Sequence, residues 1–376
     1  MSNYQIFTSE SVCAGHPDKI CDQISDAIVD EIMRQDPYGH TAIETAVTAN
    51  RVILIGEVNT TAIVDFAQVA REEIRRLGYT NPALQFTDHA KIDVLIREQS
   101  AEIALGVDNE GAGDQGMMFG YACNETPELM PLPIILAHRL TQRIDEMREH
   151  GLLPYLRPDG KAQVSVEYKD GKPMRVRHVV VAVPHNHTVD LERVRQDLYI
   201  GAIEPLLYDY GYKIDHKKDL VVNGTGVWHF SGPAADAGLT GRKIIVDGYG
   251  GMARVGGGAF SGKDCTKVDR SAAYAARFLA KNIVAAGLAD RVEVQLAYYI
   301  GAKKPVMQEF DAFGTAKADH KVIRDFMLNL LDTSVTGIIN GLDLRQPIYK
   351  QTAAYGHFGR PELPWERVVT AAQFAK

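Results

Sequence analysis

Five consecutive residues near the N-terminus, Gly15-His16-Pro17-Asp18-Lys19, combine the side chains that suit a metal-bound phosphate. The histidine and the lysine can donate hydrogen bonds to phosphate oxygens, and the carboxylate suits Mg²⁺. Pro17 favours the first position of a helix, where free backbone N–H groups attract anions. The segment therefore predicts a polyphosphate site at the start of a helix.

Asp18 is also the first of four aspartates spaced four residues apart, followed by Asp22, Asp26 and Asp30. Like charges at this spacing lie on one side of a helix and mildly destabilise it. We therefore expect a compensating partner for Asp18 at least. For the other three, a solvated acidic face is the favoured interpretation.

A second cluster is glycine-rich. Seven glycines lie between Gly248 and Gly262, and the string continues through Lys263, Asp264, Lys267, Asp269 and Arg270. Glycines allow backbone N–H groups to approach an anion closely, and the lysines add charge, so this segment also predicts polyphosphate binding. The string satisfies the GxxxxGK pattern, but Asp264 replaces the Ser or Thr of a P-loop and the nearest expected strand, 243–247, ends too early. A structural turn with incidental lysines is the alternative.

Other basic residues follow glycine-containing turns. Arg242 and Lys243 follow Gly238-Leu239-Thr240-Gly241, and Lys161 ends Arg157-Pro158-Asp159-Gly160-Lys161. Together with His16, Lys19, Lys263 and Lys267 they predict a pocket for a highly anionic ligand, provided that the loops meet in space. Asp114, within Gly111–Gly116, adds a carboxylate on a glycine-framed turn, which alone is a weak signal.

The overall composition limits the function classes. Forty-eight acidic and 41 basic residues give a net charge of −7, which argues against a nucleic-acid partner. No apolar run approaches the roughly 20 residues needed to cross a bilayer, and the N-terminus lacks a signal core, so we expect neither membrane insertion nor secretion. The four cysteines are widely spaced, which favours a reducing, cytoplasmic location.

Three segments of the chain show the same order of expected elements: a helix, two strands and a helix. The first helices are expected to begin near residues 17, 132 and 267. The expected ranges are Pro17–Met33, Thr41–Thr48, Arg51–Val58 and Thr61–Leu77; then Leu132–His150, Gln163–Tyr168, Met174–Val183 and Thr188–Gly201; then Lys267–Ala286, Arg291–Ile300, Pro305–Phe313 and His320–Leu331.

This order predicts an α+β fold in which helices cover one side of three small antiparallel sheets. The strands carry more apolar residues than one-sided burial requires, so the other sheet faces are expected to meet another subunit. The irregular segment Gln99–Gly116 is expected to be a mobile loop. The expected domains are 1–98, 117–230 and 231–376, separated by the loop 99–116.

Four motifs in this order, GHPDK at 15–19, GAGDQG at 111–116, GLTGRK at 238–243 and GGGAFSGKD at 256–264, resemble those of the S-adenosylmethionine synthases. The resemblance runs from about Phe7 to Trp365 and includes DRSAAYAAR at 269–277 and TAAYGHFGR at 352–360. It implies three similar domains around a pseudo-threefold axis. It also implies active sites between the sheets of paired subunits, in a homotetramer built as a dimer of dimers.

The implied reaction joins ATP and L-methionine to give S-adenosylmethionine, followed by hydrolysis of tripolyphosphate. Residue roles are carried over only where a motif matches. The implied catalytic residues are His16, Asp114, Lys161, Arg242, Lys263 and Lys267. The implied ATP site comprises His16, Asp159, Lys161, Trp228, Asp236, Arg242, Lys243, Ala259 and Lys263. Glu57, Gln99, Asp236 and Lys267 would bind methionine, Asp18 and Asp269 would hold Mg²⁺, and Glu44 would hold K⁺.

The chain departs from the family pattern at two positions and in one loop. Val227 stands where members usually have an arginine, which puts an ionic contact with the nucleotide in doubt, although the neighbouring Trp228 can still stack on adenine. Cys265 replaces a common proline, and nearby positive charge suggests a redox-sensitive thiolate. The loop before Gly111 is short, which bears on gating. A nucleotide hydrolase or phosphotransferase, and a non-catalytic ATP-binding subunit, are the alternative functions.

Overall fold

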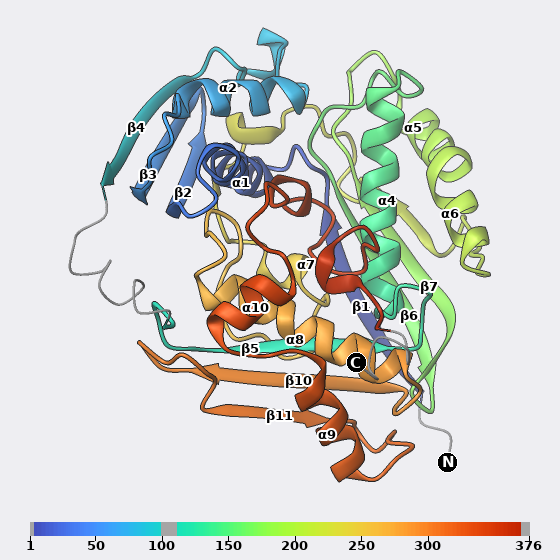
Figure 1. Ribbon diagram of the computed structural model, residues 1–376. Helices are drawn as coiled ribbons and strands as arrows, with labels where there is room; N and C mark the ends of the chain where they lie inside the picture. Colours follow the sequence, from blue (N-terminus) through green and yellow to red (C-terminus); the bar gives the residue numbers. More distant parts are fainter. Residues whose placement is uncertain (1–3, 99–110, 370–376) are drawn as a thin grey trace.

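The computed structural model describes residues 4–98 and 111–369, and within them the chain is an α+β protein with three sheets (Figure 1). The predicted order of helix, two strands and helix occurs three times. The elements are α1 (Pro17–Gln35), β2 (His40–Thr48), β3 (Arg51–Asn59) and α2 (Phe66–Arg76); α4 (Leu132–Glu149), β6 (Lys161–Lys169), β7 (Lys172–Ala182) and α5 (Leu191–Leu198); and α8 (Val268–Ala285), β10 (Arg291–Tyr298), β11 (Met307–Asp311) and α9 (His320–Leu330).

Each predicted strand pair gains neighbours from distant parts of the sequence. The sheet orders are β4-β3-β2-β9, β1-β6-β7-β8 and β11-β10-β5. The strands that the sequence did not predict are β1 (Tyr4–Val12), β4 (Lys91–Glu98), β5 (Gly116–Cys123), β8 (Leu220–Val222) and β9 (Gly238–Leu239). The pairs β3–β4 and β7–β8 are parallel, so the expectation of purely antiparallel sheets was wrong for two of the three sheets.

Sheet membership does not follow the order of the chain. The N-terminal strand β1 pairs with β6, β5 pairs with β10 of the last repeat, and β9 pairs with β2 of the first. The three repeats therefore exchange strands with one another. The division of the chain at residues 98, 116 and 230 stays a prediction.

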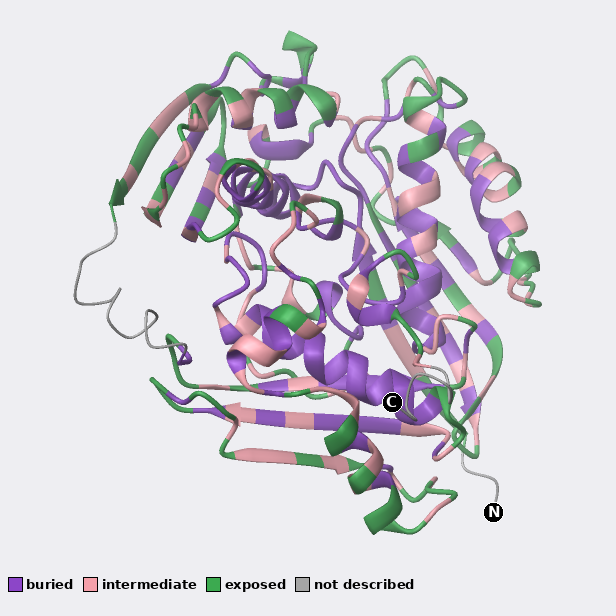
Figure 2. Ribbon diagram, in the orientation of Figure 1, coloured by how far each residue is buried: buried purple, intermediate pink, exposed green. Residues whose placement is uncertain are grey.

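The first helix of each repeat lies towards the middle of the molecule, and the sheets lie around it (Figures 1 and 2). Helix α1 packs on β2, α4 on β1 and β6, and α8 on β5 and β10. In α1 the stripe Ile20, Ile24, Ile28 and Ile32 has no exposed surface, as the spacing predicts. The outer strands keep exposed apolar side chains, among them Tyr4, Ile6, Ile55, Leu95 and Met117.

Two predicted helices begin later than expected because side chains cap them. Asp65 accepts a hydrogen bond from the backbone N of Gln68 at 3.0 Å, so α2 begins at Phe66 and not at Thr61. Asp190 caps α5 in the same way, at 2.8 Å from the backbone N of Arg193. Beyond α5 the chain forms one π-helical turn, Tyr199–Ile203, and then α6 (Glu204–Asp209), so the helical segment expected over 188–201 begins at Leu191 and continues to Asp209.

A third correction concerns the segment after Lys243. The strand expected over 243–247 is the short helix α7 (Ile244–Asp247). A P-loop requires a strand before its glycine-rich turn, so the GxxxxGK match is accidental, as the sequence indicated. Helix α10 (Val335–Gly341) was not predicted. No helix within residues 4–98 and 111–369 is long and apolar enough to span a membrane.

Candidate active site

His16 is the N-cap of α1, and its Nδ1 accepts a hydrogen bond from the backbone N of Asp18 at 3.2 Å. Because Nδ1 accepts, the neutral ring carries its proton on Nε2. Burial, followed by the charges of Lys243 and Lys161, lowers the pKa of His16 to about 3. At neutral pH the ring is therefore an uncharged hydrogen-bond donor.

Asp18 is buried at the same helix end, where the segment 239–243 gives it two hydrogen bonds and one ion pair. Its Oδ2 accepts from Lys243 Nζ at 2.5 Å, its Oδ1 accepts from the backbone N of Leu239 at 3.0 Å, and Arg242 Nε lies 3.7 Å from Oδ1. Burial acts to raise the pKa of Asp18, but the bonds from Lys243 and Leu239 outweigh it and lower the pKa. The carboxylate is thus held ionised next to two cations.

Asp159 connects this helix end to the segment that carries Trp228 and Asp236. Its buried carboxylate accepts hydrogen bonds from the backbone N atoms of Gly160 at 2.7 Å and Gly232 at 3.0 Å. Burial raises the pKa of Asp159 to about 6. The charge of Lys161, the exposed first residue of β6, acts on the pKa of both His16 and Asp159. We call His16, Asp18, Asp159, Lys161, Arg242 and Lys243 the first cluster.

The glycine-rich segment and the start of α8 form a second cluster of Lys263, Asp264, Lys267 and Asp269. Lys263 Nζ lies 2.7 Å from Asp269 Oδ2, and Lys267 Nζ lies 2.5 Å from Asp264 Oδ2. Although burial raises the pKa of Asp264, the charges of Lys267 and His40 lower it well below its usual value. A Cβ on Gly258 would lie 2.3 Å from Asp269 Cγ, so only glycine lets the loop approach this carboxylate.

The second cluster is docked on β2. Gly262 O accepts from the backbone N of Ile43 at 3.0 Å, and Asp264 Oδ2 accepts from the backbone N of Thr41 at 2.7 Å. Gly262 has φ +84°, and a Cβ there would lie 1.9 Å from the carbonyl oxygen of Ile43. A glycine at this position is therefore required both by the backbone conformation and by the space.

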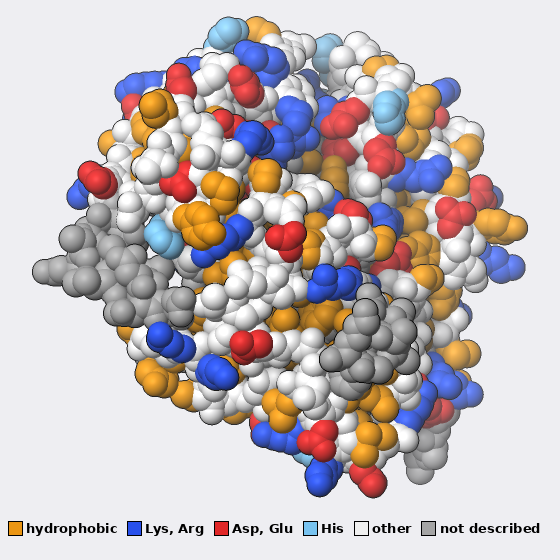
Figure 3. All heavy atoms as spheres, in the orientation of Figure 1, with side chains coloured by type: hydrophobic (Ala, Val, Ile, Leu, Met, Phe, Trp, Pro, Cys, Tyr) orange, Lys and Arg blue, Asp and Glu red, His pale blue; other side chains and the backbone are white. Residues whose placement is uncertain are grey.

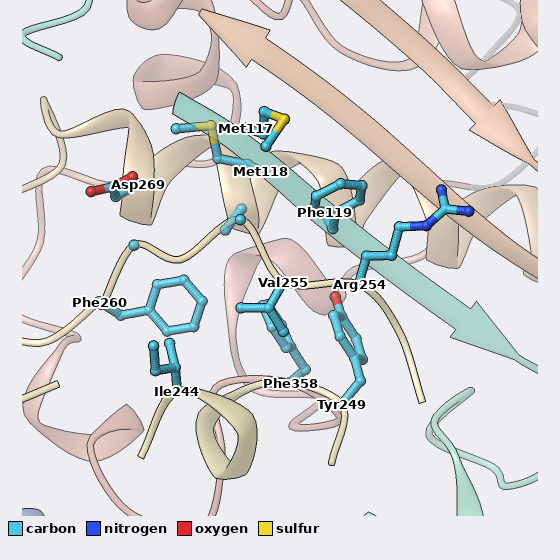
Figure 4. Close-up of a pocket in the computed structure, with 14 residues that line it drawn as sticks. Met117, Met118, Phe119, Ile244, Tyr249, Arg254, Val255, Phe260, Asp269 and Phe358 are labelled. Atoms are coloured by element: carbon cyan, nitrogen blue, oxygen red, sulfur yellow. The ribbon is translucent and has the colours of Figure 1, made fainter. Parts of the chain in front are cut away.

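A small cavity of about 30 Å³ lies behind the glycine-rich segment, between it and β5 (Figure 4). Phe260, Val255 and Met118 line it with other apolar side chains, and Asp269 and Arg254 lie at opposite ends. The volume suffices for one or two water molecules and is far too small for a nucleotide. The cavity therefore belongs to the packing under the segment.

The structure brings some of the remaining predicted residues near the clusters and leaves others apart. Gly241 of the 238–243 turn faces Ala259, since a Cβ on Gly241 would lie 2.6 Å from that of Ala259. Glu44 and Glu57 lie on the exposed, outward side of β2 and β3. Partial burial raises the pKa of Glu44, while the charge of Lys263 opposes this shift.

Three other predicted residues add no contact between the clusters. Asp114 is exposed, and its Oδ1 accepts from the backbone N of Gln115 at 2.7 Å. Asp236 is also exposed, although its charge acts on Asp159. Trp228 is half-buried and donates from Nε1 to the carbonyl of Phe230 at 2.7 Å. Gln99, and with it residues 99–110 of the loop expected at 99–116, lies outside the described residues.

Two interpretations of charged residues in α1 were wrong. Lys19 does not contribute to an anion pocket, because it is fully buried between the carboxylates of Asp22 and Asp247. Burial acts to lower the pKa of Lys19, but these two carboxylates outweigh it and raise the pKa. Asp22, Asp26 and Asp30 do not form a solvated face, since all three are buried. Their partners lie more than 200 residues further along the chain.

The thiolate suggested for Cys265 is also contradicted. The side chain is 1% exposed, and burial, together with the adjacent Asp264, raises the pKa of the thiol to about 12. A buried, protonated thiol is a poor nucleophile. The positive charge expected to activate it is instead paired with Asp264 and Asp269.

Within residues 4–98 and 111–369, no group of three or more His, Cys, Asp or Glu side chains could hold a metal ion alone. Each cluster instead pairs lysines with single carboxylates. Mg²⁺ is commonly held by one or two carboxylates together with substrate phosphates. The residue types of the two clusters are thus those that suit a metal-bound polyphosphate.

Comparison with known proteins specifies the family. Residues 4–101, 109–228 and 230–367 match the models of the S-adenosylmethionine synthetase N-terminal, central and C-terminal domains, respectively. The chain is also similar to the S-adenosylmethionine synthase of Clostridium tetani (strain Massachusetts / E88), with 51% identity over 382 residues and 96% of each chain covered. The chain belongs to the S-adenosylmethionine synthetase family.

Proposed function

We propose that the two clusters bind the triphosphate of ATP while this enzyme makes S-adenosylmethionine from ATP and L-methionine. Arg242, Lys243 and Lys263 lie on loops whose backbones are hydrogen-bonded to α1 and β2, so these backbones are fixed before a ligand arrives. Preorganised cations need no reorganisation when charge develops on a leaving group. The observation that carries the proposal is the pairing of Lys243 with Asp18 and of Lys263 with Asp269.

The sulfur of methionine is a good nucleophile without a base, so the protein must align it with C5′ of ATP. Alignment of two reactants can lower a barrier by about 7–11 kcal/mol. As the bond between C5′ and oxygen breaks, the triphosphate gains negative charge. Lys161, Arg242 and Lys263 would stabilise this charge, and the neutral His16 would donate from Nε2 to the departing oxygen. The same cations would then hold tripolyphosphate for hydrolysis to phosphate and pyrophosphate.

The carboxylates of Asp18 and Asp269 fit the Mg²⁺ that the resemblance implies. Each carboxylate pairs with a lysine, and Gly258, which has no Cβ, lets the glycine-rich loop approach Asp269 closely. When bound, the ion would neutralise phosphate oxygens and orient the chain of phosphates. The role of Asp18 and Asp269 is to fix that ion relative to α1 and α8. Glu44, whose charge interacts with that of Lys263, is the proposed K⁺ ligand.

For methionine we propose Glu57, Gln99, Asp236 and Lys267. Trp228 would stack on adenine, with Asp159, Asp236, Lys243 and Ala259 completing the nucleotide site, and Asp114 would support the adjacent loop. Glu57 lies on the outward face of β3 opposite Ala42 of β2, and Ala42 in turn pairs with Lys263 of the second cluster.

We further propose that a second copy of the chain packs on the outward sheet faces, in a homotetramer formed by two dimers in the cytoplasm. Exposed apolar side chains on all three sheets, including Ile6, Ile55 and Met117, support this packing. Three similar units around a pseudo-threefold axis would present these faces together. On the face shown in Figure 3, acidic and basic side chains are interspersed.

The test is mass-spectrometric detection of S-adenosylmethionine from the protein, ATP, Mg²⁺, K⁺ and methionine. Lys263→Ala should lower the rate by about 100-fold or more, as expected for loss of one preorganised donor. The control is Lys317→Ala, because Lys317 is an exposed lysine that also pairs with an aspartate, Asp290. Phosphate release as fast without methionine as with it would instead favour a nucleotide hydrolase. No product from folded protein would favour a non-catalytic ATP-binding subunit.

A further inference from the structure

The aspartate row of α1 makes one contact after another with the loops of the C-terminal half of the chain. Asp18 accepts from the backbone N of Leu239 at 3.0 Å, Asp22 from Gly241 at 2.8 Å and Asp26 from Gly262 at 2.9 Å. Asp30 accepts from the backbone N atoms of Tyr349 at 2.9 Å and Lys350 at 3.0 Å. The order of the aspartates along α1 is thus the order of their partners along the chain.

A helix rises about 6 Å over four residues. Successive aspartates therefore hold their partner loops at a fixed interval along a rigid element. The second and third aspartates hold the two loops that carry Lys243 and Lys263. The spacing between those two lysines is consequently set by α1 together with β2, on which both loops also lie.

Asp22 fixes the first of these loops from one side and Lys19 fixes it from the other. Asp22 binds Gly241, which precedes Arg242, and its Oδ2 also lies 2.9 Å from Lys19 Nζ. The same ammonium donates to the carboxylate of Asp247, which ends α7. Arg242 and Lys243 thus lie between two residues that bind α1: Gly241, which binds Asp22, and Asp247, which binds Lys19.

Asp26 fixes the second loop together with Arg270. The two side chains form a bidentate pair, with NH1 to Oδ1 at 2.7 Å and NH2 to Oδ2 at 2.8 Å. Arg270 NH1 also donates to the carbonyl of Lys263 at 3.0 Å, while Asp26 Oδ1 accepts from the backbone N of Gly262. The Gly262–Lys263 segment is therefore held by a donor at one end and an acceptor at the other.

Asp22, Asp26 and Arg270 have no exposed surface. A buried ion pair is seldom more stable than a well-packed apolar pair of similar volume, because desolvation is costly. Carboxylates do, however, fix backbone N–H groups with strong, directional bonds. A gain in stability therefore explains these buried charges poorly. The placement of the two loops explains why carboxylates stand at these positions.

We propose that Asp22 and Asp26 are positioning residues for the reaction, which place Arg242–Lys243 and Lys263 at the separation that the triphosphate requires. They touch no substrate and act through Gly241, Gly262 and Arg270. This inference rests on the proposed ATP site. Asp30, in the same row and also buried, binds a loop that carries none of the proposed site residues.

The test compares Asp22→Asn, Asp26→Asn and the matched control Asp30→Asn. Each variant keeps the shape of the side chain and loses its charge. Calorimetric binding of Mg²⁺–tripolyphosphate, kcat, KM for methionine and the unfolding temperature are measured for each. A displacement of about 1 Å can cost on the order of 100-fold in rate. We expect Asp22→Asn and Asp26→Asn to lose at least about tenfold in kcat and in tripolyphosphate affinity.

In the same variants, KM for methionine should change by less than about twofold, and Asp30→Asn should leave kcat and tripolyphosphate affinity within about twofold. The inference is overturned if the three variants behave alike once their unfolding temperatures are matched by adjusting the assay temperature. Should Asp26→Asn not fold, Arg270→Lys tests the same clamp, because lysine retains the charge opposite Asp26 and cannot also reach the Lys263 carbonyl. If Arg270→Lys leaves kcat and the affinity for tripolyphosphate unchanged, the inference is also overturned.

Lys263→Ala separates the two levels of the proposal. If Lys263→Ala binds tripolyphosphate as the unchanged protein does, the proposed ATP site is wrong. If Lys263→Ala binds weakly but Asp22→Asn and Asp26→Asn bind normally, the site stands and the positioning role is wrong.

Discussion

The first helices of the three repeats, α1, α4 and α8, differ in the residue at their second position. In α1 that residue is Asp18 and in α8 it is Asp269, and each receives a lysine from a glycine-containing loop. In α4 it is Pro133, within a buried apolar start that has no side-chain cap. The same backbone position therefore serves a charged site in two repeats and packing in the third.

Helix α4 supports the site from its other end. Asp145, in its last turn, accepts from the backbone N of Ala14 at 2.8 Å and from the hydroxyl of Tyr355 at 2.8 Å. Burial raises the pKa of Asp145 to about 6. This carboxylate holds the segment that leads into His16. The three helix N-termini have the same place in their repeats. A terminus carries a charged site where its second residue is an aspartate paired with a lysine from a loop, and it is apolar where that residue is Pro133.

The largest expected effect tests whether α1 and α8 are equivalent. Asp18→Asn and Asp269→Asn should each lower kcat by about 100-fold and raise the Mg²⁺ concentration for half-maximal activity, since each removes one proposed metal ligand. The measurement is the initial rate of S-adenosylmethionine formation against Mg²⁺ concentration. Asp290→Asn, at an exposed carboxylate, is the control. An unchanged Mg²⁺ dependence in one variant would show that the aspartate of that helix does not bind Mg²⁺.

The second prediction concerns the outward sheet faces, on which the second copy of the chain is proposed to pack. Ile55→Asp places a charge on the outward side of β3, where Ile55 is 47% exposed in the single chain. We expect a shift to smaller species in light scattering and a loss of about tenfold or more in activity at low protein concentration, because a buried unpaired charge opposes association. Ile63→Asp is the control, since Ile63 is 91% exposed and lies outside the sheet. Unchanged mass and activity would contradict the proposed packing.

The third prediction is that His138 of α4 affects the stability of the fold and not the binding of ATP. Burial lowers the pKa of His138 from 6.5 to about 3. Below pH 6.5 the unfolded chain binds a proton that the folded chain excludes, so the free energy of unfolding falls as the pH falls towards 3. At pH 5 the loss is about 2 kcal/mol from this histidine, at 1.36 kcal/mol for each pH unit.

Denaturant unfolding at pH 7 and pH 5 measures this loss, and His138→Asn should reduce the difference by that amount. His138 Nδ1 lies 2.8 Å from Ser11 Oγ, so the variant will also be less stable at pH 7. The informative quantity is therefore the change between the two pH values. An equal change in variant and unchanged protein would show that His138 titrates normally. The KM for ATP should remain within about twofold, because α4 carries no proposed site residue.

The smallest expected effect concerns Val227, which is 61% exposed beside Trp228. Val227→Arg restores the residue type common in the family. An exposed ionic contact contributes roughly 0–1 kcal/mol, so KM for ATP should fall by at most about fivefold, with kcat unchanged. Steady-state kinetics at two salt concentrations measures it, since an ionic gain must shrink at high salt. Val227→Gln is the uncharged control.

The sequence predicted the elements whose signals are local. The isoleucine stripe predicted α1, and the turns at Asn50 and at Asp170-Gly171 predicted two strand pairs, with positive φ values at all three residues. The strands β1 and β5 were missed because their partners lie more than 100 residues away. Their pairing is decided by tertiary contacts, which the local pattern of hydrophobic residues does not reveal.

For the site, residue types were a better guide than burial. The pairing of Asp18 and Asp269 with cations was predictable as chemistry, but the particular partners, Lys243 and Lys263, were not. Lys19 was placed in the pocket because its neighbours suggested it, whereas its carboxylate partner Asp247 is 228 residues away. A row of four like charges was itself a usable signal: such a row is unfavourable on a solvated helix and indicates partners elsewhere.

The exchange of strands between repeats constrains synthesis of the chain on the ribosome. Strand β1 is made first, yet its partner β6 begins at residue 161, and the edge of β2 receives β9 only after residue 239 has been made. At about 5–20 residues per second, the first sheet must wait on the order of 10 seconds or more for this last strand. During that time the nascent chain exposes an unpaired strand edge, so we expect chaperones to bind the first half of the chain during translation.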